Sequence, residues 1–394
     1  MAMITMIKKR DGRQVPFNIE KIANAIFKAA QTVGGKDYSE AMELADKVCQ
    51  QLSEEVIGRD PSVEEVQDMV ERVLVEQGHA KTAKAYILYR ADRTRVREMN
   101  STLMKIYEDL TFMSASDCDI KRENANIDGD TAMGTMLKYG SEGAKQFNEM
   151  YVLDPKHSQA HINGDIHIHD LDFLTLTTTC CQIDLLKLFH GGFSTGHGYL
   201  REPNDISSYA ALACIAIQSN QNDQHGGQSV PIFDYAMAEG VKKTFRRLYT
   251  TNLAKAVSFT LGIEDYTEVL EEFKLIAGDI AKEYGLYPSL QNNDEYKAKE
   301  WEIASAKYGD EFSHLQDRAE KLAESETDRA TYQAMEALIH NLNTMNSRAG
   351  AQNPFSSINY GTDTSPEGRM VIKNVMLAEE HGLGNGETPI FPIH

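Results

Sequence analysis

Three short motifs contain the residue types best suited to chemistry: His167-Ile168-His169-Asp170, Cys180-Cys181 and Gln224-His225-Gly226-Gly227-Gln228. Histidines two residues apart on a strand share a face, which suits either a divalent metal or hydrogen bonding inside a polar pocket. Neighbouring cysteines on a strand face opposite sides, so at most one of them enters a given pocket. Paired glycines let a backbone approach a ligand closely, although a plain turn explains them equally well.

A further candidate site lies in the first hundred residues, where positive charge gathers within an acidic chain. The 394 residues include 59 Asp and Glu against 40 Lys and Arg, a net charge of −19. That balance disfavours a whole surface that binds nucleic acid or an anionic membrane. Residues 79–97 nevertheless contain six basic residues and one acidic residue, and Lys8, Lys9, Arg10 and Arg13 lie on a predicted hairpin. Cations that converge in this way could bind a triphosphate, although no Walker-type loop is present.

The elements expected to position the N-terminal charges are a hairpin and helices. Strand-like segments flank Asp11-Gly12, which predicts a tight two-residue turn. Asn18 is the candidate N-cap of a helix that follows the hairpin, and Ser62 with Glu65 forms a capping box for a later helix. A basic helix begins near Ala80 and is followed by a helical connector.

From residue 121 the pattern changes to alternating strands and helices, which predicts an α/β domain. Strands are expected at 166–169 and 175–181, and helices at 205–219, 235–251 and 327–345. The charge-dense stretch 294–326 is expected to form exposed helices without chemistry.

Cysteine content and hydropathy predict the compartment. Five cysteines on a long chain do not suggest a secreted disulfide framework. The longest apolar run, residues 209–217, is about half the length that a bilayer helix needs. We therefore expect a cytoplasmic protein that does not associate with membranes.

Residues 1–95 resemble the ATP-cone, the regulatory nucleotide-binding module of ribonucleotide reductases. The resemblance rests on Lys9-Arg10-Asp11-Gly12, Phe17-Asn18, Lys21-Ile22 and the helix at 80–93. It implies that ATP switches activity on and dATP switches it off. The residues that it implies in nucleotide binding are Lys9, Arg10, Asn18, Lys21 and Arg90.

The motifs after residue 121, taken together and in order, resemble the anaerobic, class III ribonucleoside-triphosphate reductases, which are glycyl radical enzymes. The segments that carry this resemblance are Arg122 to Asn126, His167 to Asp170, Cys180-Cys181, Gln224 to Gln228, Asn353 to Ser356, Tyr360 to Thr362 and Thr388 to Pro392. The implied fold is a mainly helical ATP-cone with a β-hairpin at 1–95, a helical connector at 96–120, and the first part of a ten-stranded α/β barrel at 121–394.

The resemblance also implies a reaction, the reduction of ribonucleoside triphosphates to deoxyribonucleoside triphosphates by glycyl and thiyl radical chemistry without oxygen. Cys180 would be the second active-site cysteine, opposite the thiyl carrier across the ribose. His167, His169, Gln224, His225, Gly226 and Gly227 would bind the substrate, without metal. The segment 354–363 matches the loop that relays a deoxynucleotide effector, bound at a dimer interface, to the substrate site.

The implied cofactors and partners reach beyond this chain. They are a glycyl radical, a structural zinc in a C-terminal region, formate as reductant, a homodimer or larger homo-oligomer, and a radical-SAM iron–sulfur activating enzyme. No residue here matches the radical glycine, the thiyl cysteine or the zinc ligands, so the resemblance implies a truncated chain that is inactive alone.

Two alternatives remain open from the sequence. A metal-dependent amidohydrolase would use His167 and His169 as ligands. A nucleotide-sensing regulatory module would explain residues 1–95 but would leave the rest without a role.

Overall fold

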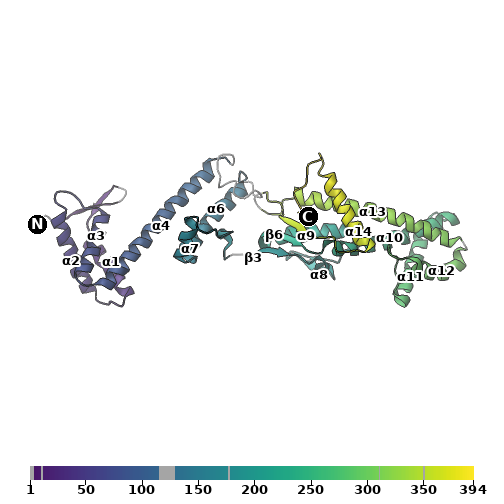
Figure 1. Ribbon diagram of the computed structural model, residues 1–394, viewed down its shortest axis with the longest axis horizontal. Coiled ribbons are helices and arrows are strands. Elements are labelled where there is room, and N and C mark those ends of the chain that lie inside the picture. The colour runs from purple at the N-terminus through teal and green to yellow at the C-terminus, as the bar shows by residue number, and fades with distance from the viewer. Residues whose placement is uncertain (1–3, 10–11, 115–128, 176–177, 310, 349–350) are drawn as a thin grey trace. The chain divides into compact units, whose positions relative to one another are not determined.

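The computed structural model describes residues 4–9, 12–114, 129–175, 178–309, 311–348 and 351–394 (Figure 1). Side chains are not described at 98–101. The chain divides into two compact units, Met1–Tyr107 and Glu108–His394. Each unit has hydrophobic core residues of its own.

The first unit opens with an antiparallel hairpin of β1 (Met6–Lys8) and β2 (Gln14–Pro16), in which Lys8 lies opposite Gln14. The amide of Lys9 donates to the carbonyl of Arg13 at 2.8 Å, and Gly12 has a φ of 82°. The predicted two-residue turn is therefore wrong, because the bonded residues Lys9 and Arg13 have three residues between them in the sequence, the last of which is the left-handed Gly12.

Four helices follow: α1 (Ile19–Thr32), α2 (Tyr38–Glu55), α3 (Val63–Glu76) and α4 (Ala80–Phe112). Both predicted caps are confirmed. Asn18 Oδ1 accepts the amide of Lys21 at 3.3 Å, and Ser62 and Glu65 bond reciprocally at 3.2 and 2.8 Å. Helix α4 continues through most of the predicted connector, whose last residues lie outside the described part of the chain.

The second unit includes the end of α4, and its next elements in the described residues are α6 (Ala132–Phe147), η1 (Asn148–Val152), α7 (Pro155–Ile162) and η2 (Leu171–Phe173). The strand predicted at 166–169 is wrong, since a bend at 166 and a turn at 169 flank two residues without regular secondary structure. The amide of Ile168 donates to Nδ1 of His161 at 3.2 Å, a local bond that replaces strand pairing. Asp170 adopts a left-handed conformation with φ 50°.

The sheet of this unit is parallel, in the order β3 (Thr178–Gln182), β6 (Gln224–Val230) and β7 (Ser356–Ile358). The predicted α/β class is confirmed. Residues 224–227, which the sequence suggested as a loop, belong to the central strand instead. Beyond β7, Ile393 bridges to Ser357 in parallel. A small hairpin joins β4 (Phe193–Ser194) to β5 (Tyr199–Leu200).

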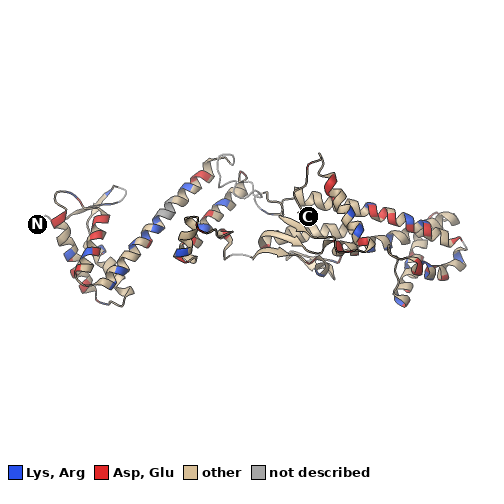
Figure 2. Ribbon diagram, viewed as in Figure 1, with Lys and Arg blue, Asp and Glu red and all other residues tan. Residues whose placement is uncertain are grey.

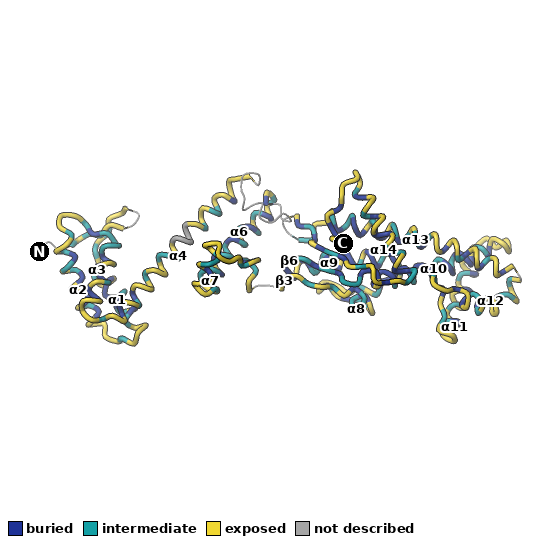
Figure 3. Tube along the Cα trace, viewed as in Figure 1, coloured by how far each residue is buried: buried dark blue, intermediate teal, exposed yellow. Residues whose placement is uncertain are grey.

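Helices cover this sheet and bury its core: α8 (Leu185–Phe189), α9 (Ile206–Asp223), α10 (Phe233–Leu261), α13 (Phe312–Thr344) and α14 (Pro366–His381). Figure 3 shows the burial along α9 and α10 beside the sheet. The three helices predicted here are confirmed, and α10 and α13 are much longer than predicted.

The C-terminal part of α10 and the N-terminal part of α13 pack with α11 (Thr267–Tyr284) and α12 (Asp294–Tyr308) around a separate core. Tyr296 on α12 is only 1% exposed, and Phe312 on α13 is fully buried. The expectation of merely exposed helices at 294–326 is therefore wrong. Buried residues recur every three or four positions along these helices, but Glu300 and Gln316 are among them, so the buried face is not uniformly hydrophobic in the sequence.

No helix in the described ranges combines the length and the apolar character needed to cross a membrane.

Candidate functional site

Cys180 lies at an irregularity of the parallel sheet. On β3 one residue, Cys180, separates Thr179 from Cys181, whereas on β6 two residues separate their partners His225 and Gln228. This is the arrangement of a β-bulge, which redirects side chains locally. Cys180 has a φ of 43° and an exposed, free thiol.

The two residues of the bulge are glycines, and one of them must be. A Cβ atom on Gly226, whose φ is 95°, would stand 2.9 Å from Sγ of Cys180. A Cβ atom on Gly227 would meet Phe355 at an ordinary 3.5 Å. Of the two glycines, only Gly226 lies so close to the thiol of Cys180 that a side chain would not fit.

Cys181 lies in a different environment from its neighbour. Nδ2 of Asn220 on α9 is 2.9 Å from Sγ of Cys181 and donates to Oε1 of Gln228 at 2.7 Å. The second thiol is thus tied to the helix that covers the sheet.

His225 connects β6 to the segment that contains the paired histidines. Its Nε2 lies 3.1 Å from Oδ1 of Asp170, and its ring stacks on Phe173 with centroids 3.9 Å apart and planes 15° apart. His225 is 8% exposed, and its Nδ1 is buried without a hydrogen-bond partner among the described residues.

His167 and His169 are both exposed, and their ring centroids lie 5.8 Å apart. Nε2 of His169 is 3.4 Å from Oδ2 of Asp170. Across the described residues, no group of three or more His, Cys, Asp or Glu side chains could hold a metal. The structure thus gives the amidohydrolase alternative no ligand set in those residues.

Gln224, at the start of β6, is buried and its Nε2 donates to the carbonyl of Gly226 at 3.0 Å. Nη1 of Arg348 donates to the carbonyls of Gln221 and Gln224 at 3.1 and 3.2 Å. Burial lowers the pKa of Arg348. The sequence reading missed Arg348, whose one signal was its place shortly before the predicted effector loop.

The structure shows that the predicted effector loop, residues 354–363, includes strand β7, and that the loop after β7 is anchored by a carboxylate that was not predicted from the sequence. Oδ2 of the fully buried Asp234 accepts the backbone amides of Gly361, Thr362 and Asp363 at 2.8, 3.0 and 2.9 Å. Because Asp234 lies in the first turn of α10, the loop is fixed to the helix layer.

In the first unit, the predicted nucleotide-binding residues Lys9, Asn18 and Lys21 are exposed at the hairpin and the start of α1. Figure 2 shows the basic residues along α4. Nη1 of Arg90 is paired with Asp68 and Glu71 on α3, at 2.5 and 2.8 Å. No hydrogen bond or ion pair within the described ranges joins Arg90 to the other three, and Arg10 lies outside those ranges.

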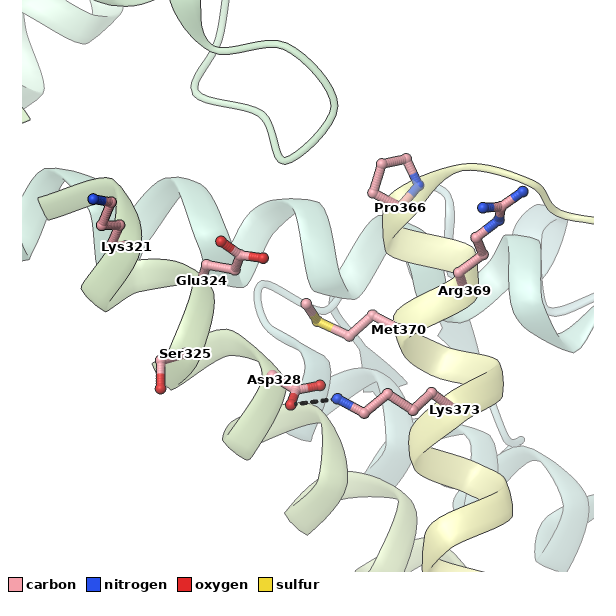
Figure 4. Close-up of a pocket in the computed structure, with 8 residues that line it drawn as sticks. All are labelled: Lys321, Glu324, Ser325, Asp328, Pro366, Arg369, Met370 and Lys373. Atoms are coloured by element: carbon pink, nitrogen blue, oxygen red, sulfur yellow. Dashed lines mark hydrogen bonds and ion pairs between the residues drawn. The ribbon is translucent and has the colours of Figure 1, made fainter. Parts of the chain in front are cut away.

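A surface hollow of about 420 Å³ lies between α13 and α14 (Figure 4). Nζ of Lys373 pairs with Asp328 across it at 2.8 Å, and Lys321, Glu324 and Arg369 contribute further charges of both signs. None of the predicted site residues lines this hollow.

Comparison with known proteins yields two family matches. The model described as anaerobic ribonucleoside-triphosphate reductase matches residues 123–394, and the ATP cone domain matches residues 5–95. Both matches agree with the resemblances found in the sequence.

Individual relatives carry the same description. The anaerobic ribonucleoside-triphosphate reductase of Salmonella typhimurium is 26% identical over 393 residues, which are 99% of this chain and 46% of that protein. The Escherichia coli protein of the same name is 27% identical, with the same coverage. The chain thus spans about half the length of these relatives. A solved structure of the Thermotoga maritima anaerobic ribonucleotide reductase in complex with dATP and CTP is 13% identical over 73% of this chain and 40% of that one, with a TM-score of 0.38.

Proposed function

Because the chain belongs to the anaerobic ribonucleoside-triphosphate reductase family, we propose that it forms the nucleotide-sensing module and first catalytic part of an enzyme that reduces ribonucleoside triphosphates to deoxyribonucleoside triphosphates. The observation that carries this proposal is the free, exposed Cys180 on β3, which lies at a bulge opposite two glycines of the central strand β6.

In this proposal Cys180 supplies a reducing thiol to the ribose. Its thiol is free and exposed, and the absence of a side chain at Gly226 leaves room beside Sγ. The glycyl radical of the family would supply the one-electron chemistry when present. His167, His169, Gln224, His225, Gly226 and Gly227 would surround the substrate.

The ATP-cone would bind ATP or dATP through Lys9, Arg10, Asn18, Lys21 and Arg90. The exposure of Lys9 and Lys21 supports this assignment, since a triphosphate needs accessible cations. Arg90 would have to exchange Asp68 and Glu71 for phosphate, which makes its contribution conditional on a rearrangement of α3 and α4 side chains.

The remaining proposals follow from the family. They are a cytoplasmic homodimer or larger homo-oligomer, a deoxynucleotide effector relayed through residues 354–363, a radical-SAM iron–sulfur activating enzyme, a structural zinc outside this chain, and formate as reductant.

Anaerobic turnover of the natural gene product that contains this chain tests the reaction. Cys180→Ser is expected to lower deoxynucleotide formation by about 100-fold or more, because a hydroxyl cannot replace the thiol as reductant. The matched variant Cys181→Ser, one residue away, should stay within about three-fold of the native enzyme. Near-native reduction by Cys180→Ser would refute the assignment.

Calorimetry with ATP and dATP tests the module. Lys9→Ala and Lys21→Ala should each weaken binding by about ten-fold, the usual worth of a charge-assisted phosphate contact. Lys28 is an exposed lysine on α1, the helix that also contains Lys21, and it is not among the predicted residues. Lys28→Ala should leave the affinity for both nucleotides unchanged. Equal affinities for all variants would contradict the predicted site.

A further inference from the structure

Asp170 bonds two histidines that lie far apart in the sequence. Its Oδ1 is 3.1 Å from Nε2 of His225 on β6, and its Oδ2 is 3.4 Å from Nε2 of its neighbour His169. One carboxylate therefore joins the histidine segment, defined here as residues 161–173, to the central strand of the sheet.

Phe173 adds a second contact to the same imidazole. The two rings are stacked at 3.9 Å with nearly parallel planes, and the imidazole is nine-tenths buried. A stacked ring restrains tilting, and a carboxylate on Nε2 restrains rotation in the ring plane. Together they give the imidazole of His225 one orientation.

The backbone of the same residue belongs to the cysteine site. His225 lies opposite Thr179 in the β3–β6 ladder, and the next residue, Gly226, is the one that contacts Cys180. A continuous path thus runs from His169 through Asp170 and His225 to the strand position beside the thiol.

We propose that Asp170, His225 and Phe173 form a latch that holds the histidine segment against β6, so that His167 and His169 are positioned beside Cys180. His225 acts in this latch as a positioning residue, in addition to any surface it offers to substrate. The expected effect of the latch on catalysis rests on the proposed function. Its expected hold on residues 161–173 does not.

Hydrogen exchange of the chain tests the structural half. Phe173→Leu removes the stacking and should speed amide exchange across 161–173 by about ten-fold or more. Phe173→Tyr keeps the stacking and should restore most of the protection. Phe147→Leu makes the same change at an exposed ring on α6 that packs against Tyr151, and should leave exchange across 161–173 unchanged. Unchanged exchange in Phe173→Leu, or an equal rise in Phe147→Leu, would overturn the latch.

Turnover of the natural gene product tests the positioning role. Phe173→Leu and Asp170→Asn should lower kcat by about ten-fold while effector affinity and melting temperature stay near native values, whereas a merely structural role would lower the melting temperature instead. Native kcat with faster exchange would refute positioning. If the native gene product reduces no ribonucleotide, the proposed function fails and the exchange result still decides the latch.

Discussion

Gly226 lies so close to Cys180 that a methyl group on its Cα would stand 2.9 Å from the cysteine sulfur. The contact arises because β6 has one more residue than β3 at this point of the ladder. The position of the thiol therefore depends on the glycine across the bulge as much as on the strand that contains it.

Gly226→Ala should disturb the thiol specifically. A Cβ at a φ of 95° is strained, and it would also collide with Sγ, so we expect a loss of about 2–4 kcal/mol in the local stability of β3 and β6. Hydrogen exchange of these strands measures the loss. Gly227→Ala, with only an ordinary contact to Phe355, is the control and should cost less than about 1 kcal/mol. Equal effects of the two variants would contradict the account.

Asp234→Asn should release the loop at 361–363. The buried carboxylate accepts three backbone amides on Oδ2 and the amide of Tyr235 on Oδ1, so an uncharged amide group in its place turns its N–H toward at least one donor and weakens the bonds to the others. We expect a cost of about 3 kcal/mol in local stability, seen as faster exchange of these three amides. The same change at Asp184, which caps the short helix α8, should cost less than about 0.5 kcal/mol, because Asn caps a helix about as well as Asp, and should leave the loop protected. A protected loop in Asp234→Asn would show that other contacts hold it.

Local signals predicted local structure well. Ser62 and Glu65 correctly predicted the start of α3, because a capping box depends only on residues three apart. The alternation at 166–169 predicted a strand that the structure does not have. The backbone there is fixed instead by the bond from the amide of Ile168 to His161 and by the contact of Asp170 with His225. Neither partner could be identified from a period of two.

The motifs at 167–169, 180 and 224–227 were chosen by residue type, and their role in substrate binding and catalysis stays a prediction. The structure brings two of their members, His169 and His225, to one carboxylate. The bulge at Cys180 was out of reach, since it depends on the register between strands more than forty residues apart. Asp234 was missed for the same reason, because its role depends on backbone amides of a distant loop.

Thiol labelling should separate the cysteines by environment. Burial raises the pKa of Cys214 to about 12, and burial together with the charge of Asp46 raises that of Cys49 to about 11. Since the thiolate is the nucleophile, iodoacetamide at pH 8 should modify the exposed Cys180 at least about ten-fold faster than either. Peptide mapping resolves the positions, and unfolding the chain in urea should equalise the rates. Rapid labelling of Cys214 in the folded chain would show that α9 opens readily.

Glu300 should make the stability of the separate core between α10, α11, α12 and α13 depend on pH. The side chain of Glu300 accepts hydrogen bonds from Tyr249, Tyr296 and Gln316 at 2.7, 3.1 and 2.8 Å. Desolvation by burial raises its pKa in the folded protein, although the three donors oppose the rise. An acid whose folded pKa is raised contributes stability that is complete below its unfolded pKa of about 4.3 and is lost as the pH rises through the folded value.

Glu300→Gln should therefore flatten the decline in stability as the pH rises above the unfolded pKa of about 4.3, because the amide cannot ionise and the tyrosine hydroxyls can turn to meet it. Trp301, the single tryptophan of the chain, lies on the same helix, so its fluorescence during urea unfolding reports on this core. Glu300→Leu should cost about 3 kcal/mol or more at every pH, because it leaves three buried donors unpaired. Glu302→Gln, an exposed neighbour paired with Lys299, is the control and should change the unfolding free energy by less than about 0.5 kcal/mol. A native pH profile in Glu300→Gln would locate the titrating group elsewhere.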